Sequence, residues 1–407
     1  MTTHRLLSLC TKIGSGATPR GGKETYSQSG EISLIRSQNV LDLSFSTDGL
    51  VYISAAQAKL LDSVTIQPND VLINITGDSV GRVCSVPEYV GEARVNQHVA
   101  ILRADEKRLS ATYLRYYLVN PSMKRKLLTM ASVGATRNAL TKVMLDNLEI
   151  SIPTYRQQKR IAEILSSLDD KIELNRQMNQ TLEETAQAMF KHHFVDGVDR
   201  DNLPEGWRIF KLGELIDSVS ITHKFPKPEI IFLNTSDILE GSVLISNYSD
   251  VDSLPGQAKK RICKGDILYS EIRPGNKRYA YVDFNAEDYV VSTKLMVLRS
   301  KCIVDSIFPY FFLTQQSTIK YLQNIAESRS GTFPQITFEQ IKIIELTLPS
   351  LDKVQQFTSD ILKPNYDLIL SNNKEIERLI EVRDYLLPKL IAGEIIPAEL
   401  KQLEQAL

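Results

Sequence analysis

Residues 70–103 read DVLINITGDSVGRVCSVPEYVGEARVNQHVAILR, and residues 266–299 read DILYSEIRPGNKRYAYVDFNAEDYVVSTKLMVLR. The two stretches align without a gap at a shift of 196 residues. Identical pairs run along the whole alignment: Asp70/Asp266, Leu72/Leu268, Arg82/Arg278, Val86/Val282, Val95/Val291, Leu102/Leu298 and Arg103/Arg299. Agreement over this length at one shift favours an internal duplication over chance similarity between β-rich segments.

Each copy extends beyond this stretch. The same shift aligns LTKVMLDNLEISIP (residues 140–153) with ITFEQIKIIELTLP (residues 336–349). Short apolar runs such as Val71-Leu72-Ile73, separated by Gly, Asn and Asp, predict strands, and residues 111–130 are typical of a helix. We therefore expect a mixed α+β domain in each copy.

A different pattern follows the first domain. Residues 157–194 contain no Pro or Gly. Core-type residues recur there at seven-residue spacing, at Ile161, Leu168, Asn175, Leu182 and Met189, with a second row at Ile164, Met178 and Thr185 widened by Leu165 and Ile172. Because the opposite face is charged, this pattern predicts one long amphipathic helix that needs a partner.

The equivalent segment after the second domain has its own apolar seam, formed by Leu362, Ile369, Ile376, Leu379 and Leu386. Pro364 is expected to kink this helix near its start. Asn175 and Asn372 occupy equivalent positions in the two helices. A buried Asn would fix the register of the helix pair, whereas a surface Asn would have no such role, and the sequence leaves both interpretations open.

The parts follow the order domain (residues 1–153), helix (154–198), domain (199–350) and helix (351–407). If the second helix packs against the first, it must run back along it. The two helices are then antiparallel, and an approximate two-fold axis relates the two halves of the chain.

Composition excludes several classes of protein. Of 407 residues, 43% are hydrophobic and 24% charged, which is ordinary for a globular protein. No apolar run approaches the ~20 residues needed to span a bilayer, and the first residues lack the pattern of a signal peptide. The four cysteines are far apart, which argues against a zinc ribbon or a disulfide scaffold, so we expect a reducing cytoplasm. A net charge of -1 does not by itself indicate a nucleic-acid partner.

Catalytic motifs are missing from the sequence. It contains neither the Asn/Asp-Pro-Pro-aromatic tetrapeptide of amino-methyltransferases nor a Gly-rich cofactor loop after a strand. Residues 77–82, GDSVGR, do not form a phosphate-binding loop. His192 and His193 are adjacent, so on a helix they point in different directions and cannot form a metal-binding pair. We therefore expect no catalysis, metal or cofactor in this chain.

Several segments resemble a known family. SGATP (residues 15–19) followed by ISLIRSQNV (32–40) is similar to the opening of target recognition domains. QQKRIAEILSSLDDKI (157–172) resembles the central conserved region of Type I restriction-modification specificity subunits, and LLPKLIAGEI (386–395) their C-terminal conserved region. The resemblance covers essentially the whole chain. The second domain departs from the first, because GTFPQ (331–335) lacks an equivalent of Arg137.

The resemblance implies a non-catalytic subunit with two tandem target recognition domains separated by two long antiparallel helices. The expected partners are double-stranded DNA, two modification (methyltransferase) subunits and restriction subunits, with no membrane. S-adenosylmethionine, ATP and Mg²⁺ are expected on the partner subunits. The seam residues Ile161, Leu168, Asn175, Leu182, Met189, Leu362, Ile369, Ile376 and Leu379 mark the helices on which the partners would dock.

The length of the first helix predicts a split recognition site. About 34 helical residues at ~1.5 Å each extend for about 50 Å, and ~34–36 Å of B-DNA contains about 10 base pairs. The two domains would then read blocks centred roughly 12–15 base pairs apart. Because the domains differ in sequence, the blocks need not be palindromic.

DNA contacts are expected on loops that occur in both copies, where Arg, Lys, Asn, Gln, Ser and Thr can reach base edges or phosphates. In the first domain the candidates are Thr18, Arg20, Lys23, Arg36, Gln38, Asn39, Ser79, Arg82, Asn96, Gln97, Thr136, Arg137 and Asn138. In the second domain they are Asn276, Lys277, Arg278, Lys294, Thr332 and Gln335. Arg82 and Arg278 have a rival interpretation, because a residue kept through duplication can be structural.

Two other functions are compatible with the pattern. The chain could be a recognition module for another effector, such as a self-contained modification-cleavage enzyme, which a neighbouring methyltransferase gene would exclude. It could also be a coiled-coil scaffold, which predicts no preference between DNA sequences and leaves the polar loops unexplained.

Overall fold

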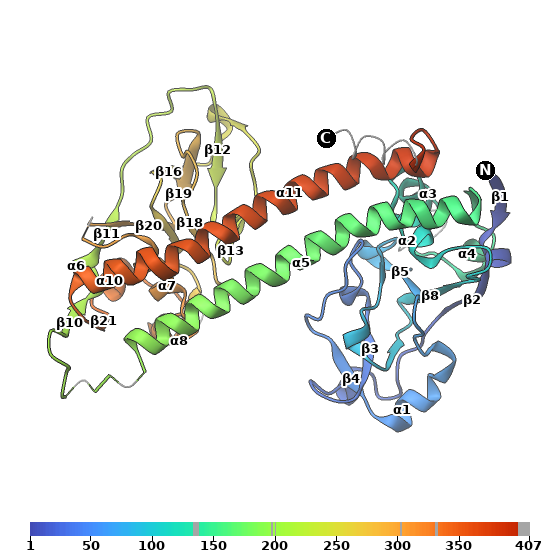
Figure 1. Cartoon of the computed structure of the whole chain (residues 1–407), viewed down its shortest axis with the longest axis horizontal. Helices are drawn as coiled ribbons and strands as arrows, with labels where there is room; N and C mark the ends of the chain where they lie inside the picture. The colour runs from blue at the N-terminus through green and yellow to red at the C-terminus, as the bar shows by residue number, and fades with distance from the viewer. Residues whose placement is uncertain (133–137, 197, 200, 302, 330–332, 398–407) are drawn as a thin grey trace. The chain divides into compact units, whose positions relative to one another are not determined.

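The computed structural model describes residues 1–407 except 133–137, 197, 200, 302, 330–332 and 398–407. The chain folds into two compact units, one formed by Met1–Asn175 with Glu375–Leu407 and the other by Arg176–Lys374. The boundary falls inside both long helices, α5 (Tyr155–Phe194) and α11 (Lys363–Ala392), so each unit contains one domain and part of each helix. Figure 1 draws α5 in green and α11 in red.

The domain of the first unit is built on a four-stranded antiparallel sheet in the order β2 (Cys10–Ser15), β8 (Val99–Ala104), β5 (Val71–Asn74) and β6 (Val83–Ser85). A three-stranded sheet has the order β4 (Val51–Ile53), β3 (Ile32–Ile35) and β7 (Ala93–Val95), and β1 (Thr2–Arg5) pairs with β9 (Glu149–Ile152). All of β5 is buried because its side chains alternate between two cores: Val71 and Ile73 enter one, and Leu72 enters the other.

The helices of this domain are α1 (Ala55–Leu60), α2 (Ala111–Val119), α3 (Pro121–Ser132) and α4 (Lys142–Asp146), with short 3₁₀ turns η1 (Leu6–Leu9), η2 (Gly22–Thr25), η3 (Ser37–Asn39), η4 (Asp62–Val64), η5 (Gly77–Ser79) and η6 (Glu88–Val90). The helical stretch predicted over residues 111–130 is confirmed, but it is divided into two helices, because α2 ends before Asn120 and α3 begins at Pro121. A residue before proline is sterically disfavoured in the helical conformation, and Asn120 has a ψ of 133°.

The second unit repeats this sheet in the order β11 (Ile216–Val219), β20 (Leu295–Ser300), β17 (Ile267–Ser270) and β18 (Tyr279–Tyr281). Its register is the same: Val71 faces Leu102 in the first domain, and Ile267 faces Leu298 in the second, both shifted by 196 residues. A second sheet has the order β15 (Ser249–Asp250), β12 (Glu229–Leu233), β19 (Tyr289–Ser292) and β16 (Ala258–Arg261). The duplication is therefore confirmed in the strand pairing itself.

The remaining elements of the second unit complete the copy. The strand pairs are β10 (Arg208–Lys211) with β21 (Glu345–Leu348) and β13 (Ile238–Leu239) with β14 (Ser242–Val243). The helices and turns are α6 (Leu212–Leu215), η7 (Thr235–Asp237), η8 (Val251–Ser253), η9 (Pro274–Asn276), α7 (Ile307–Thr314), α8 (Gln316–Arg329), α9 (Phe338–Ile341) and α10 (Leu351–Phe357).

A buried ion pair explains two of the identities between the copies. Asp70 is buried immediately before β5 and accepts two hydrogen bonds from Arg103, at 2.7 and 2.8 Å. Asp266 and Arg299 repeat this arrangement at 2.6 and 2.8 Å. Each aspartate also accepts a hydrogen bond from a backbone N–H, that of Gln67 or Cys263. These pairs tie the turn before the central strand to the neighbouring strand in each domain.

The long helix predicted over residues 157–194 is confirmed by α5. Ile161 and Leu165 are buried in one cluster with the α11 residues Leu387 and Leu390. In the second unit, Ala186, Phe190 and Phe194 are buried in one cluster with Leu362 and Tyr366, which lie near the start of the returning helix. The helices are therefore antiparallel in each unit, as expected.

The second predicted row on α5 was partly wrong. Met178 and Thr185 are exposed, whereas Leu165 and Ile172 are buried. An α-helix has 3.6 residues per turn, so a strict seven-residue row drifts by ~20° per repeat and leaves the buried face along a helix of 40 residues. The seam residues Leu168, Leu182, Met189, Ile369, Ile376 and Leu379 are half-buried.

The seam asparagines are buried and hydrogen-bonded to the partner helix. Asn175 donates to Glu375 at 2.9 Å in the first unit. In the second unit Asn372 donates to Asn179, and Asn179 donates to Asn373, both at 2.8 Å. A one-turn slip of either helix would break these bonds and leave buried amides unpaired, so the geometry favours the register role over the surface interpretation.

The start of the second helical segment is irregular where Pro364 predicted a kink. A π-helical turn, η10 (Thr358–Leu362), lies between α10 and α11, and Pro364 is the second residue of α11. Proline has no N–H for the carbonyl four residues earlier, so the regular hydrogen-bond ladder is interrupted at this point. No helix among the described residues is both long and apolar enough to cross a membrane.

Candidate nucleic-acid interface

The turn after the central strand of the first domain lies beside a cavity of about 580 Å³. The cavity brings together loops that are far apart in the sequence, and its lining is Ser37, Gln38, Thr76, Gly77, Asp78, Ser79, Arg82, His98, Asn138 and Ala139. Four of the predicted DNA-binding residues, Gln38, Ser79, Arg82 and Asn138, therefore meet at one place. Hydroxyl, amide, imidazole and guanidinium groups are the groups that hydrogen-bond base edges and phosphates.

Backbone hydrogen bonds hold the turn in shape. The N–H of Gly77 donates to Asn138 at 3.0 Å, and the N–H of Asn74 donates to the carbonyl of Arg82 at 2.9 Å. Gly77 and Gly81 both have positive φ angles, of 75° and 77°, which glycine adopts without steric cost. The Arg82 side chain is exposed and makes no hydrogen bond or ion pair with the residues that the structure describes. It is therefore available to a ligand.

His98 lies in a chain of polar side chains at the cavity. Its Nδ1 atom is 2.6 Å from the Thr76 hydroxyl, and its Nε2 atom is 2.9 Å from the Gln97 amide. Asn96 is buried and its Oδ1 atom accepts the N–H of His98 at 3.0 Å. Ser292 makes the same contact with Lys294 in the second domain, at 3.2 Å. Asn96 thus shapes the loop, while Gln97 is exposed and His98 lines the cavity.

Asn39 has a structural role in this fold. Its side chain is fully buried, accepts the N–H of Arg36 and donates to the carbonyls of Ser46 and Asp48. The Arg36 guanidinium donates to the Gly49 carbonyl and lies over the Tyr26 ring. Asn39 therefore shapes the loop that presents Gln38, a role that residue type alone did not distinguish from base reading.

We expect Asn39→Ala to destabilise this loop by ~1–3 kcal/mol, because it leaves buried backbone groups without partners. Hydrogen exchange of the amides in residues 36–49 measures the effect. The matched control is Gln38→Ala, whose exposed amide makes two hydrogen bonds to the same loop, at 3.2 and 3.3 Å; because water can replace these bonds, their loss should change protection far less. Normal protection in Asn39→Ala combined with lost DNA binding would assign Asn39 to recognition instead.

Thr18, Arg20 and Lys23 do not line the cavity. They are exposed on the loop that follows β2. This loop starts against β7, where a Cβ at Gly16 would lie 1.6 Å from the Val95 carbonyl oxygen. The predicted residues Thr136, Arg137 and Thr332 lie outside the described residues.

The second domain places different side chains on the same turn. Lys277 forms an ion pair with Glu240 at 2.9 Å, Lys294 lies 3.8 Å from Glu271, and Asn276 is exposed. Gln335 is half-buried and its backbone bridges that of Ile272. The Arg278 guanidinium donates to the carbonyls of Ser236 and Ile238 at 2.9 and 3.0 Å.

Sequence reasoning missed an exposed cation on this turn of the second domain. Arg273 precedes the predicted residues and has a φ of 45°, in the left-handed region that costs a non-glycine residue ~1–2 kcal/mol. Arg273 has the position in the repeat that Gly77 has in the first domain. The N–H of Arg273 donates to the Pro334 carbonyl at 3.1 Å, as the N–H of Gly77 donates to the Asn138 carbonyl at 3.0 Å. The alignment at a shift of 196 contained this signal, since it pairs Arg273 with a turn glycine.

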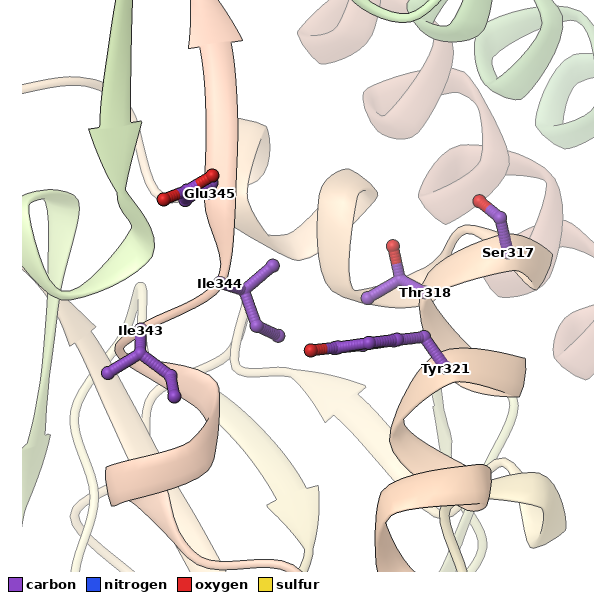
Figure 2. Close-up of a pocket in the computed structure, with 6 residues that line it drawn as sticks. All are labelled: Ser317, Thr318, Tyr321, Ile343, Ile344 and Glu345. Atoms are coloured by element: carbon purple, nitrogen blue, oxygen red, sulfur yellow. The ribbon is translucent and has the colours of Figure 1, made fainter.

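A second cavity, of about 370 Å³, lies between α8 and the start of β21 in the second unit. Figure 2 shows the Tyr321 side chain extending from α8 toward Ile344, with Thr318 above it. The lining contains no basic residue and one carboxylate, Glu345, so this cavity is poorly suited to a nucleic-acid backbone. Among the described residues, no group of three or more His, Cys, Asp or Glu side chains could hold a metal ion.

The chain matches the family model of the Type I restriction modification DNA specificity domain twice, over residues 1–184 and 204–381. It is 44% identical over 180 residues to the Type I restriction enzyme HindI specificity subunit of Haemophilus influenzae, a match covering 43% of this chain and 39% of that protein. It is 23% identical over 412 residues to the putative MjaX specificity subunit of Methanocaldococcus jannaschii, covering 96% of this chain and 93% of that protein.

A similar fold has been determined by crystallography. The S subunit of a Type I restriction-modification system from M. genitalium aligns with a TM-score of 0.59 and 18% identity, covering 96% of this chain and 95% of that chain. The two family domains occupy the two copies that the sequence and strand register define. The chain belongs to the family of Type I restriction-modification specificity subunits.

Proposed function

We infer that this chain is the non-catalytic subunit that selects the DNA sequence for a Type I restriction-modification complex. One observation carries this proposal: a turn with the same backbone hydrogen bonds presents different polar side chains in the two domains. In the first domain these include Ser79 and Arg82, which line the cavity. In the second they include Arg273 and Asn276. A common frame with different recognition side chains is what two half-sites of unlike sequence require.

The site is bipartite in this proposal, with one half for each domain. The blocks are not palindromic, because the two turns differ in their side chains. The 40 residues of α5 would extend for about 60 Å, so in this proposal the blocks are centred at most roughly 18 base pairs apart, rather than the 12–15 expected from a helix of about 34 residues.

The partners in this proposal are two modification subunits and restriction subunits, which dock on the long helices and carry S-adenosylmethionine, ATP and Mg²⁺. Apolar side chains that stay exposed on these helices support it. In the first unit Leu174 of α5 is 52% exposed, and Val382 and Tyr385 of α11 are 46% and 60% exposed. They are apolar side chains that a docked subunit would cover.

Genome-wide mapping of methylated bases, in cells with and without this chain, tests the function. We expect a motif of two short blocks around an unread spacer, present only when the chain is expressed. An unchanged methylation pattern would contradict the proposal. Purified chain that binds all DNA equally, at any salt concentration, would favour the scaffold interpretation.

A further inference from the structure

The arginine shared by the two turns, Arg82 in the first domain and Arg278 in the second, has two different environments. The Arg82 side chain is exposed and makes no hydrogen bond or ion pair with the described residues. Arg278 is half-buried and its guanidinium donates to two backbone carbonyls, those of Ser236 and Ile238. The backbone around both is the same, since the N–H of Asn74 donates to Arg82 at 2.9 Å and that of Ser270 donates to Arg278 at 2.8 Å.

A different residue at the end of the central strand, Asn74 in β5 and Ser270 in β17, explains why the two arginines differ. In the first domain the Asn74 amide donates to the carbonyls of Ser37 and Val40, at 2.8 and 3.2 Å, and so holds η3 against the central strand. The equivalent residue in the second domain is Ser270, whose hydroxyl bonds the backbone of Ile272 instead. A serine side chain is too short to replace the amide.

Arg278 takes over this task in the second domain. The turn η7 corresponds to η3. The Asp237 carboxylate accepts the N–H of Asn234, just as the Asn39 side-chain oxygen accepts the N–H of Arg36. Ile238 therefore corresponds to Val40, and the carbonyl that Asn74 holds in one domain is held by Arg278 in the other. Where the amide is present, the arginine side chain is left for a ligand, and where it is absent, the arginine holds the turn.

A different cation faces solvent on the second turn. Arg273 occupies the position that Gly77 has in the first domain. A Cβ at Gly77 would meet no atom within 4 Å, so the fold leaves room for a side chain at this position beside the cavity. The Arg273 side chain is exposed and makes no hydrogen bond or ion pair with the described residues. Arg273 keeps the left-handed backbone of the glycine at a cost in conformational energy. A strained position that carries an unpaired arginine indicates a functional requirement.

We propose that the base-reading arginine has moved between the repeats: Arg82 reads the half-site of the first domain, Arg273 reads that of the second, and Arg278 is structural. The proposal rests on the proposed function. A guanidinium donates two parallel hydrogen bonds to the O6 and N7 atoms of guanine, so each half-site should contain a guanine at the position that its arginine reaches.

The test uses the full chain assembled with its modification subunits and compares methylation motifs for single variants. We expect Arg273→Ala to relax the second-domain block at one position, with discrimination falling ~5- to 150-fold, while the first-domain block and the Tm stay unchanged. Arg82→Ala should do the reverse. Arg261→Ala is the matched control, because it removes an exposed arginine from β16 in the same domain and should leave both blocks intact.

Arg278→Ala should lower the Tm, and Ser270→Asn added to it should restore the Tm by supplying the amide of Asn74. The restored double variant should still select the second-domain block. Relaxation of that block in the folded double variant, with normal selection by Arg273→Ala, would overturn the proposal. So would uniform weakening on all sequences by Arg273→Ala with a smaller salt dependence, which marks a phosphate contact. A wild-type complex without any two-block motif would instead contradict the proposed function.

Discussion

Arg103→Met is expected to destabilise the first domain by ~3–5 kcal/mol, because it leaves the buried Asp70 carboxylate without its cation. The Asp70 side chain is 0% exposed, and the hydrogen bond from the Gln67 N–H would be its remaining partner. Methionine keeps the unbranched stem of arginine, so the loss is mainly electrostatic. Hydrogen exchange of the β5 and β8 amides measures the effect, with β17 and β20 of the second domain as an internal reference.

A double variant separates this cause from lost packing. Replacing both partners with apolar residues, as in Asp70→Leu with Arg103→Met, removes the unpaired buried charge. We expect the double variant to be more stable than Arg103→Met alone. The surface control Glu163→Ala removes the partner of Arg160 in an exposed pair and should cost less than ~1 kcal/mol. A double variant as unstable as the single one would show that packing, and not charge, sets the effect.

Leu165→Asp is expected to have the larger effect, a loss of more than ~4 kcal/mol that prevents the first unit from packing on its helices. Leu165 is 0% exposed in α5 and shares a buried cluster with Leu387, Leu390 and Ile391 of α11. An aspartate there would have to be buried as a charge without a partner or be protonated. Hydrogen exchange of residues 386–392 and of α2 would report the separation.

The matched control is Leu174→Asp on the same helix. Leu174 is 52% exposed, so the same chemical change should alter stability by ~0.5 kcal/mol or less. Equal destabilisation by the two variants would contradict the assignment of Leu165 to the core that joins α5 and α11. Leu168 and Leu182 are half-buried, so aspartate there should have intermediate effects.

Much of the fold is determined by local pattern, which the sequence carries directly. The duplication, the central strands and the 40-residue helix follow from identities at one shift and from spacing alone. The position of the buried stripe on α5 was harder to predict from the sequence, because a seven-residue row and a helix of 3.6 residues per turn separate gradually with length. The break at Asn120 and Pro121 was encoded locally and was available to sequence reasoning.

The candidate site depended on the tertiary structure. The sequence determined which loops recur and which carry polar side chains, and it placed Gln38, Ser79, Arg82 and Asn138 among the candidates. Only the fold decided that these four meet at one cavity, that Asn39 is buried, and that Arg278 holds a backbone turn while Arg82 does not. The physical reason is that a side chain's role depends on which carbonyls lie within its reach, and that distance is set by loops tens of residues away in the chain.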